Sequence, residues 1–143
     1  MVNLFQTNSL ILLAFLVIAL ATLSGCTKPP YTNLDNEQLK AKLDQNIPLY
    51  DVRRPEEWLQ TGVVKNSRLL TFADQSGRLK PDFIRKFTAA IGKHEAVMLI
   101  CRTGNRTDSL ARFLIEKLGY TQVYNVRRGI RGWIREGRPV VRP

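Results

Sequence analysis

A strand–loop–helix unit at residues 97–107 restricts the possible folds of this chain more than any other segment. Residues 97–100 form an apolar run with the length of a buried strand, and Cys101 follows directly. A loop with two arginines and one glycine comes next, and we expect a helix to begin near Thr107. The cysteine therefore lies between the carboxyl end of a strand and the amino end of a helix, where backbone N–H groups and the helix dipole attract anions.

This position suits Cys101 to act as a nucleophile. A free thiol has a pKa near ~8.5 and is mostly protonated at neutral pH. Lowering that value below ~7 requires about 2 kcal/mol of preference for the thiolate, because each pKa unit corresponds to ~1.36 kcal/mol. A helix terminus supplies only ~0.3–1 kcal/mol. We therefore expect Arg102 and Arg106 to supply the remainder, and Cys101 to be the catalytic residue.

The rest of the chain after residue 34 alternates between apolar strands and amphipathic helices. Strands are expected over about 47–52, 67–72, 96–100 and 122–126, and helices over about 35–45, 55–60, 81–92, 107–118 and 130–136. Asn33 or Thr32 is the expected cap of the first helix. Such alternation predicts an α/β fold with a parallel sheet that helices cover on both faces. Ligands of these sheets bind at the carboxyl ends of the strands.

Residues 101–107, Cys-Arg-Thr-Gly-Asn-Arg-Thr, resemble the active-site loop of rhodaneses, which carry sulfur as a cysteine persulfide. Segments 47–53, 55–62 and 124–140 resemble other parts of a rhodanese domain, so that the likeness covers roughly residues 33–141 in order. It implies a five-stranded parallel sheet flanked by helices on both faces. The chain departs from the family pattern at Gly62-Val63-Val64, where Gly-His-Ile is usual, and at Arg128-Gly129, where paired glycines are usual.

Each residue of the loop has an expected part in binding an anionic sulfur donor. The guanidinium groups of Arg102 and Arg106 suit the oxygens of the donor. Gly104 allows the backbone to turn so that successive N–H groups converge on one anion. Thr103 and Asn105 contribute backbone amides. The alternative for the arginines is that they are solvated surface residues.

Three further residues are expected to support this loop. Thr107 is the expected cap of the helix, and Asp51 is expected to brace the loop rather than to act as an acid. Arg53 could pair with a carboxylate on the neighbouring helix. The only histidine, His94, is expected to be exposed in a turn, which fits a mechanism without a general base. One histidine and no cysteine cluster offer no ligand set, so we expect neither a metal nor another cofactor.

The amino terminus resembles the signal peptide of a bacterial lipoprotein. The first 25 residues contain no charged side chain, and the apolar run at residues 10–21 is shorter than the ~20 residues of a membrane-spanning helix. Leu-Ser-Gly-Cys at residues 23–26 resembles a lipobox, which implies cleavage before Cys26 and a lipid on its sulfur. No Lys or Arg precedes the apolar run, so an uncleaved anchor is the alternative.

These features divide the chain into a signal peptide (1–25), a lipidated tether (26–34) and a rhodanese-like domain (35–143). The resemblance implies a domain held at the periplasmic face of the cell envelope. Thr27, in a position where aspartate often indicates retention in the inner membrane, favours the outer membrane.

The net charge of +10 indicates an anionic partner. Small anions and an anionic membrane surface both fit, whereas no nucleic-acid-binding motif accompanies the charge. The expected partners are a small anionic sulfur donor such as thiosulfate, a thiol or cyanide as acceptor, and the membrane through the lipid anchor.

Other interpretations of the cysteines and of the loop remain open. Cys26 and Cys101 could form a disulfide, although acylation of Cys26 would prevent it, and Cys101 could be a buried apolar residue. The domain could hold sulfur or bind a partner without turnover. A phosphatase or an arsenate reductase is a third possibility, but those loops resemble Cys-x5-Arg, whereas Cys101 and Arg106 give Cys-x4-Arg.

Overall fold

A parallel five-stranded sheet forms the centre of the molecule, as the resemblance to rhodaneses implies. The computed structural model describes residues 28–143. Its strands are β1 (Thr32–Leu34), β2 (Leu49–Asp51), β3 (Arg68–Leu69), β4 (Val97–Ile100) and β5 (Val123–Val126), arranged in the order β1-β5-β4-β2-β3. All four neighbouring pairs are parallel. The expected signal peptide and Cys26 lie outside the described residues.

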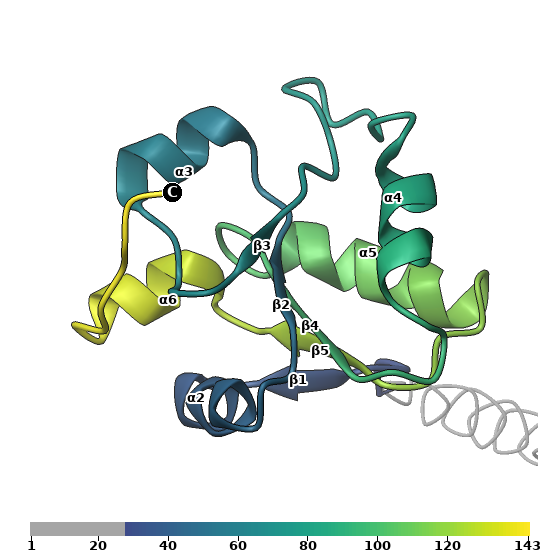
Figure 1. The fold of residues 1–143 in the computed structure, drawn as a ribbon, viewed down its shortest axis with the longest axis horizontal. Coiled ribbons are helices and arrows are strands. Elements are labelled where there is room, and N and C mark those ends of the chain that lie inside the picture. The colour runs from purple at the N-terminus through teal and green to yellow at the C-terminus, as the bar shows by residue number, and fades with distance from the viewer. Residues whose placement is uncertain (1–27) are drawn as a thin grey trace, which may run out of the picture.

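Helices cover both faces of this sheet (Figure 1). Five helices are described: α2 (Asn36–Asp44), α3 (Pro55–Thr61), α4 (Phe83–Ala90), α5 (Asn105–Glu116) and α6 (Gly129–Arg135). Helices α4 and α5 pack on one face, and α2 and α6 pack on the other. None of the helices within residues 28–143 has both the length and the apolar character needed to cross a membrane.

The alternation of side chains along β4 fills both layers of the core. Val97 and Leu99 belong to the cluster that includes α4 and α5, whereas Met98 and Ile100 belong to the cluster that includes α2 and α6. All four side chains are buried, as expected for a central parallel strand. Cys101 therefore directly follows the central strand of the sheet, whose side chains are all buried.

The amino-terminal boundary of the folded domain corrects the sequence analysis. Residues 32–34, which were expected to belong to the tether, form β1 at the edge of the sheet and pair with β5. The cap of the next helix is Asp35, whose carboxylate accepts a hydrogen bond of 2.8 Å from the Gln38 N–H, and not Asn33 or Thr32. A three-residue edge strand has too few residues for its pattern to be recognised, so only pairing with β5 defines it.

Candidate active site

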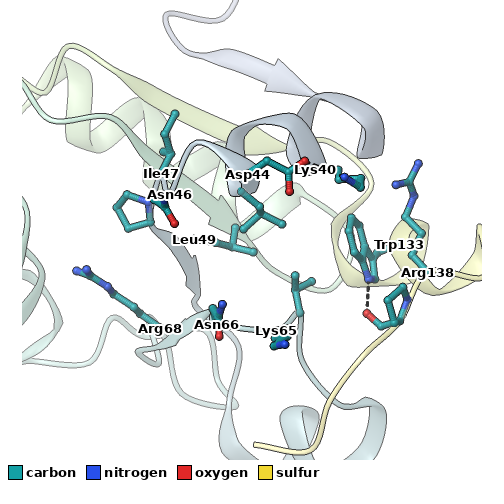
Figure 2. Close-up of a pocket in the computed structure, with 14 residues that line it drawn as sticks. Lys40, Asp44, Asn46, Ile47, Leu49, Lys65, Asn66, Arg68, Trp133 and Arg138 are labelled. Atoms are coloured by element: carbon teal, nitrogen blue, oxygen red, sulfur yellow. Dashed lines mark hydrogen bonds and ion pairs between the residues drawn. The ribbon is translucent and has the colours of Figure 1, made fainter.

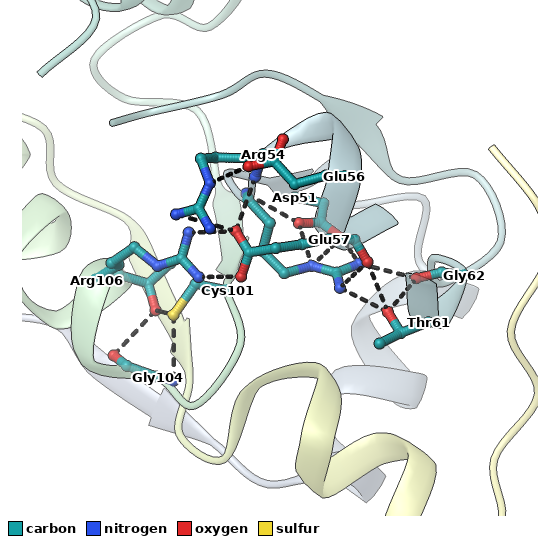
Figure 3. Close-up of polar contacts among 11 residues, drawn as sticks. Asp51, Arg54, Glu56, Glu57, Thr61, Gly62, Cys101, Gly104 and Arg106 are labelled. Carbon is teal, nitrogen blue, oxygen red and sulfur yellow. Dashed lines mark hydrogen bonds and ion pairs between the residues drawn. The ribbon is translucent and has the colours of Figure 1, made fainter. Parts of the chain in front are cut away.

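The sulfur of Cys101 lies inside a tight loop between β4 and α5 (Figure 3). Cys101 is 1% exposed and has no disulfide partner within residues 28–143. Its Sγ accepts a hydrogen bond of 3.2 Å from the Gly104 N–H and lies 3.4 Å from Thr107 Oγ1. The loop thus directs a backbone N–H donor at the sulfur.

The helix after this loop begins two residues earlier than the sequence suggests. α5 starts at Asn105, and its cap is Gly104 with φ +96°, not Thr107. Thr107 lies in the first turn, where its hydroxyl donates to the Gly104 carbonyl over 3.0 Å. The hydroxyl consequently stabilises the turn around the sulfur instead of capping the helix.

The segment after β5 packs directly against the loop. A Cβ on Gly104 would lie 2.2 Å from the Arg127 carbonyl oxygen, and a Cβ on Gly129 would lie 2.5 Å from the Cys101 carbonyl oxygen. Gly129 has φ +56°, and the N–H of Ile130 donates to the Cys101 carbonyl over 2.8 Å. Both glycines are required because the two backbones touch, which fixes the loop from the side of α6.

A buried ion pair supports the neighbouring strand end. Arg53 is fully buried, and its guanidinium donates to both carboxylate oxygens of Asp51 over distances of 2.7–3.0 Å. Its other N–H groups reach Thr61 Oγ1 at 2.7 Å, the Gly62 carbonyl at 2.9 Å and the Glu57 carbonyl at 3.2 Å. Asp51 thus braces Arg53. Arg53 itself pairs with its own strand and with helix carbonyls, not with a carboxylate of α3.

A second ion pair, which the sequence analysis did not anticipate, connects α3 to the cysteine loop. Arg106 Nη1 donates to Glu57 Oε2 over 2.8 Å, and Nη2 donates to Oε1 over 2.5 Å. Glu57 Oε2 also accepts a hydrogen bond of 3.0 Å from the Arg54 N–H at the start of the helix. Glu57 therefore holds the guanidinium of Arg106 in one orientation beside the loop that contains Cys101.

The charges of this pair stabilise each other. Burial by itself would raise the pKa of Glu57, but the hydrogen bonds from Arg106 and from the Arg54 backbone, with the charges of both arginines, lower it to about 2. The hydrogen bonds and the charge of Glu57 raise the pKa of Arg106 against an opposing effect of burial, and the charge at Cys101 adds to that increase. Glu57 remains ionised throughout the physiological range.

Arg102 and Arg106 line a recess at the mouth of the loop. The recess has a volume of about 620 Å³, and Arg54, Glu57 and Phe72 are among its other lining residues. The Arg102 side chain is exposed, whereas that of Arg106 is 26% exposed. Both terminal nitrogens of Arg106 keep a second N–H beyond those that bind Glu57. The recess can therefore receive an anion next to the loop.

A second basic recess adjoins the loop on the side of α6. Thr103 lines it together with four arginines, Arg127, Arg128, Arg131 and Arg135, around a volume of about 270 Å³. Within residues 28–143, none of these four arginines forms an ion pair. They contribute positive potential beside the loop.

Two other ionisable residues, His94 and Asp108, lie outside the cysteine loop. His94 is exposed between α4 and β4, as predicted. Asp108, in the first turn of α5, forms an ion pair of 3.2 Å with Arg112 and accepts a hydrogen bond from the Tyr31 hydroxyl. These partners hold its carboxylate within a local network.

Glu57 is the site residue whose role the sequence did not reveal. The signal that could have identified it is its place as the third residue of a helix that begins at Pro55, directly after a strand end. Glu56 stands beside it but is exposed and pairs with Arg54. Only the tertiary structure distinguishes the two glutamates.

Comparison with known proteins agrees with this architecture. Residues 35–136 match the model of the rhodanese-like domain. The chain belongs to the rhodanese-like family. It is 30% identical over 112 residues to a sulfurtransferase of Allochromatium vinosum, which covers 77% of this chain and 94% of the relative.

Two more comparisons extend this finding. A thiosulfate sulfurtransferase of Tolumonas auensis is 29% identical over 104 residues, covering 72% of this chain and 88% of that protein. The crystal structure of a rhodanese-related protein from Thermoplasma volcanium superposes with a TM-score of 0.60 at 26% identity, covering 79% of this chain and all of the other. The rhodanese-like domain thus has relatives named as sulfurtransferases at modest identity.

Proposed function

We propose that this protein is a sulfurtransferase that carries sulfane sulfur as a persulfide on Cys101. The observation that carries the proposal is the sulfur in its loop, where Sγ accepts the Gly104 N–H at 3.2 Å at the carboxyl end of β4. The family and the names of two relatives support it. The positive charge of Arg102 and Arg106 at the mouth suits an anionic donor such as thiosulfate.

The proposed reaction consists of two displacements at sulfur. The Cys101 thiolate attacks the outer sulfur of thiosulfate, an S–S bond forms to Cys101, and the S–S bond of thiosulfate breaks so that sulfite leaves with the electron pair. A thiophile, either cyanide or a thiolate, then attacks the terminal sulfur of the persulfide. That S–S bond breaks, thiocyanate or a new persulfide leaves, and the Cys101 thiolate returns. No proton transfer is required when both nucleophiles are ionised.

The residues at the loop have separate parts in this cycle. The Gly104 N–H stabilises charge on Cys101 Sγ before attack and again when the thiolate leaves the persulfide. Arg102 and Arg106 hold the oxygens of the donor, with Thr103 and Asn105 contributing backbone N–H groups. Glu57 holds the guanidinium of Arg106 in one orientation beside the loop.

Mass spectrometry after incubation with thiosulfate tests the proposal. The peptide that contains Cys101 should gain the mass of one sulfur, cyanide should remove it as thiocyanate, and Cys101→Ser should gain nothing. Loading without transfer to cyanide or to thiols would instead indicate a sulfur carrier without turnover. Hydrolysis of an aryl phosphate without sulfur loading would overturn the proposal in favour of a phosphatase.

We also propose that the domain is anchored to a bacterial membrane through a lipid on Cys26. The supporting observation is the Leu-Ser-Gly-Cys sequence at residues 23–26 after an apolar run. In a bacterial host, Cys26→Ser should accumulate as unprocessed precursor, while the unaltered chain incorporates labelled fatty acid. Normal processing of the Cys26→Ser variant would contradict the anchor.

A further inference from the structure

A pocket remote from Cys101 has the composition of a binding site for an amphipathic anion (Figure 2). Its volume is about 600 Å³, which lies within the range of small-molecule sites. Pro48 and Leu49 line it at the amino end of β2, whereas Cys101 follows the carboxyl end of β4. The pocket shares no lining residue with the recess at the loop mouth.

The floor of this pocket is apolar and is built from three separate parts of the chain. Leu49 and Val64 are 1% and 2% exposed, and Trp133 of α6 is 5% exposed. The indole N–H of Trp133 donates to the Pro139 carbonyl over 2.8 Å, which fixes the ring in the wall. Leu43 and Ile47 complete the apolar surface. These contacts make the floor a preformed surface for an apolar group.

Two of the four cations that line the pocket are paired with carboxylates. Lys40 forms an ion pair of 2.8 Å with Asp44, and Arg138 pairs with Glu136 at 3.1 Å and with Glu37.

Lys65 and Arg68, on the opposite side of the pocket, differ from these cations. Both side chains are exposed, and within residues 28–143 neither has a carboxylate at ion-pair distance. The Arg68 guanidinium donates to the Tyr50 hydroxyl over 3.3 Å and lies 5.7 Å from the centre of the Tyr50 ring. Tyr50 belongs to the core cluster on the other face of the sheet, so this contact holds the guanidinium at the edge of the pocket and away from its apolar floor. Asp44 is the one carboxylate among the described lining residues, and Lys40 already neutralises it.

From this combination we infer that the pocket binds a small organic anion with an apolar body, of the size of a medium-chain carboxylate. The apolar part lies against Val64 and Trp133, and the anionic head meets Lys65, while Arg68 adds positive potential at the same edge. The unpaired positive charge at one edge of an apolar floor selects an anion over a neutral or cationic molecule of equal length. This inference does not depend on the chemistry of Cys101.

Titration with decanoate tests the inference, with Trp133 as the reporter. Trp58→Phe removes the other tryptophan from α3, so that the fluorescence change reports on the pocket alone. In this background, decanoate should produce a saturable change, whereas decyltrimethylammonium, of the same chain length and opposite charge, should produce none. Sulfur loading of Cys101 should be unchanged by decanoate.

Variants of the rim separate specific binding from general attraction to a basic protein. The double substitution Lys65→Gln, Arg68→Gln should weaken decanoate binding at least about tenfold, which corresponds to about 1.4 kcal/mol. Lys117→Gln, an exposed lysine at the end of α5, is the matched control and should leave the affinity unchanged. A missing saturable change, equal binding of the cation, or equal affinity in the double variant would each overturn the inference.

Discussion

Arg53 and Arg106 occupy comparable positions but are used differently. Arg53 lies just after β2 and Arg106 lies in the first turn of α5, after the loop that follows β4, and each pairs with one carboxylate, Asp51 or Glu57. The Arg53 side chain is 1% exposed, and its N–H groups bind five acceptor atoms within the domain. The Arg106 side chain is 26% exposed and binds only Glu57 among the described residues.

This difference shows how an arginine can stabilise the fold at one site and be available to bind a ligand at another. A guanidinium has five N–H donors in a rigid fork. When the fold binds all of them, as at Arg53, the residue holds the strand to the following helix. When the fold binds only one edge, as at Arg106, the charge is oriented and part of its hydrogen-bonding capacity is available to an anion.

The largest effect is expected when the buried pair is broken. Arg53→Met leaves the Asp51 carboxylate buried without its partner, and the free energy of unfolding should fall by about 3–5 kcal/mol. Urea denaturation measures this loss as a lower midpoint. The double substitution Asp51→Asn, Arg53→Met removes the buried charge and should recover part of the stability; a double variant as unstable as the single one would contradict this explanation.

A smaller effect is expected from the titration of Glu57. Its pKa falls from 4.5 to about 2 on folding, so the pair stabilises the folded state above pH 4.5 and this contribution disappears as pH decreases through 4.5 towards 2. The shift corresponds to roughly 3 kcal/mol at ~1.36 kcal/mol per pKa unit. Glu57→Gln should remove this part of the acid destabilisation in denaturation experiments between pH 2 and 6.

The neighbouring glutamate provides the control for that experiment. Glu56 is exposed, and its pKa is lowered mainly by the side-chain hydrogen bond from Arg54. Glu56→Gln should therefore leave most of the pH dependence in place. If both variants lost it equally, the Glu57–Arg106 pair would not be its source.

The smallest effect is expected from Arg106→Lys, which tests the difference between Arg53 and Arg106 most directly. Arg106→Lys retains the charge but loses the bidentate geometry, and we expect the KM for thiosulfate to rise about tenfold, which is about 1.4 kcal/mol, with a smaller change in kcat. Arg112→Lys, whose parent side chain pairs with Asp108 outside the loop, is the matched control. An unchanged KM would mean that Arg106, like Arg53, has only a structural role.

Most elements could be predicted from local patterns. The apolar run at β4, the proline at the start of α3 and the helical spacing of α4 identify these elements because each pattern lies within a few neighbouring residues. The edge strand β1 and the start of α5 could not be placed in this way. β1 exists through its pairing with β5, and α5 begins at Asn105 because Gly104 adopts a positive φ against the Arg127 backbone.

The sequence by itself determined the α/β class of the fold and the position of Cys101 between a strand and a helix, because periodicity and loop composition are local properties. The tertiary structure decided which charges meet. Arg53 pairs with Asp51 of the strand before it, and Glu57 rather than Glu56 pairs with Arg106. Lys65 and Arg68, beside the far pocket, have no carboxylate partner among residues 28–143. These choices depend on distances between segments far apart in the chain, and such distances are fixed only when the sheet assembles and its helices pack.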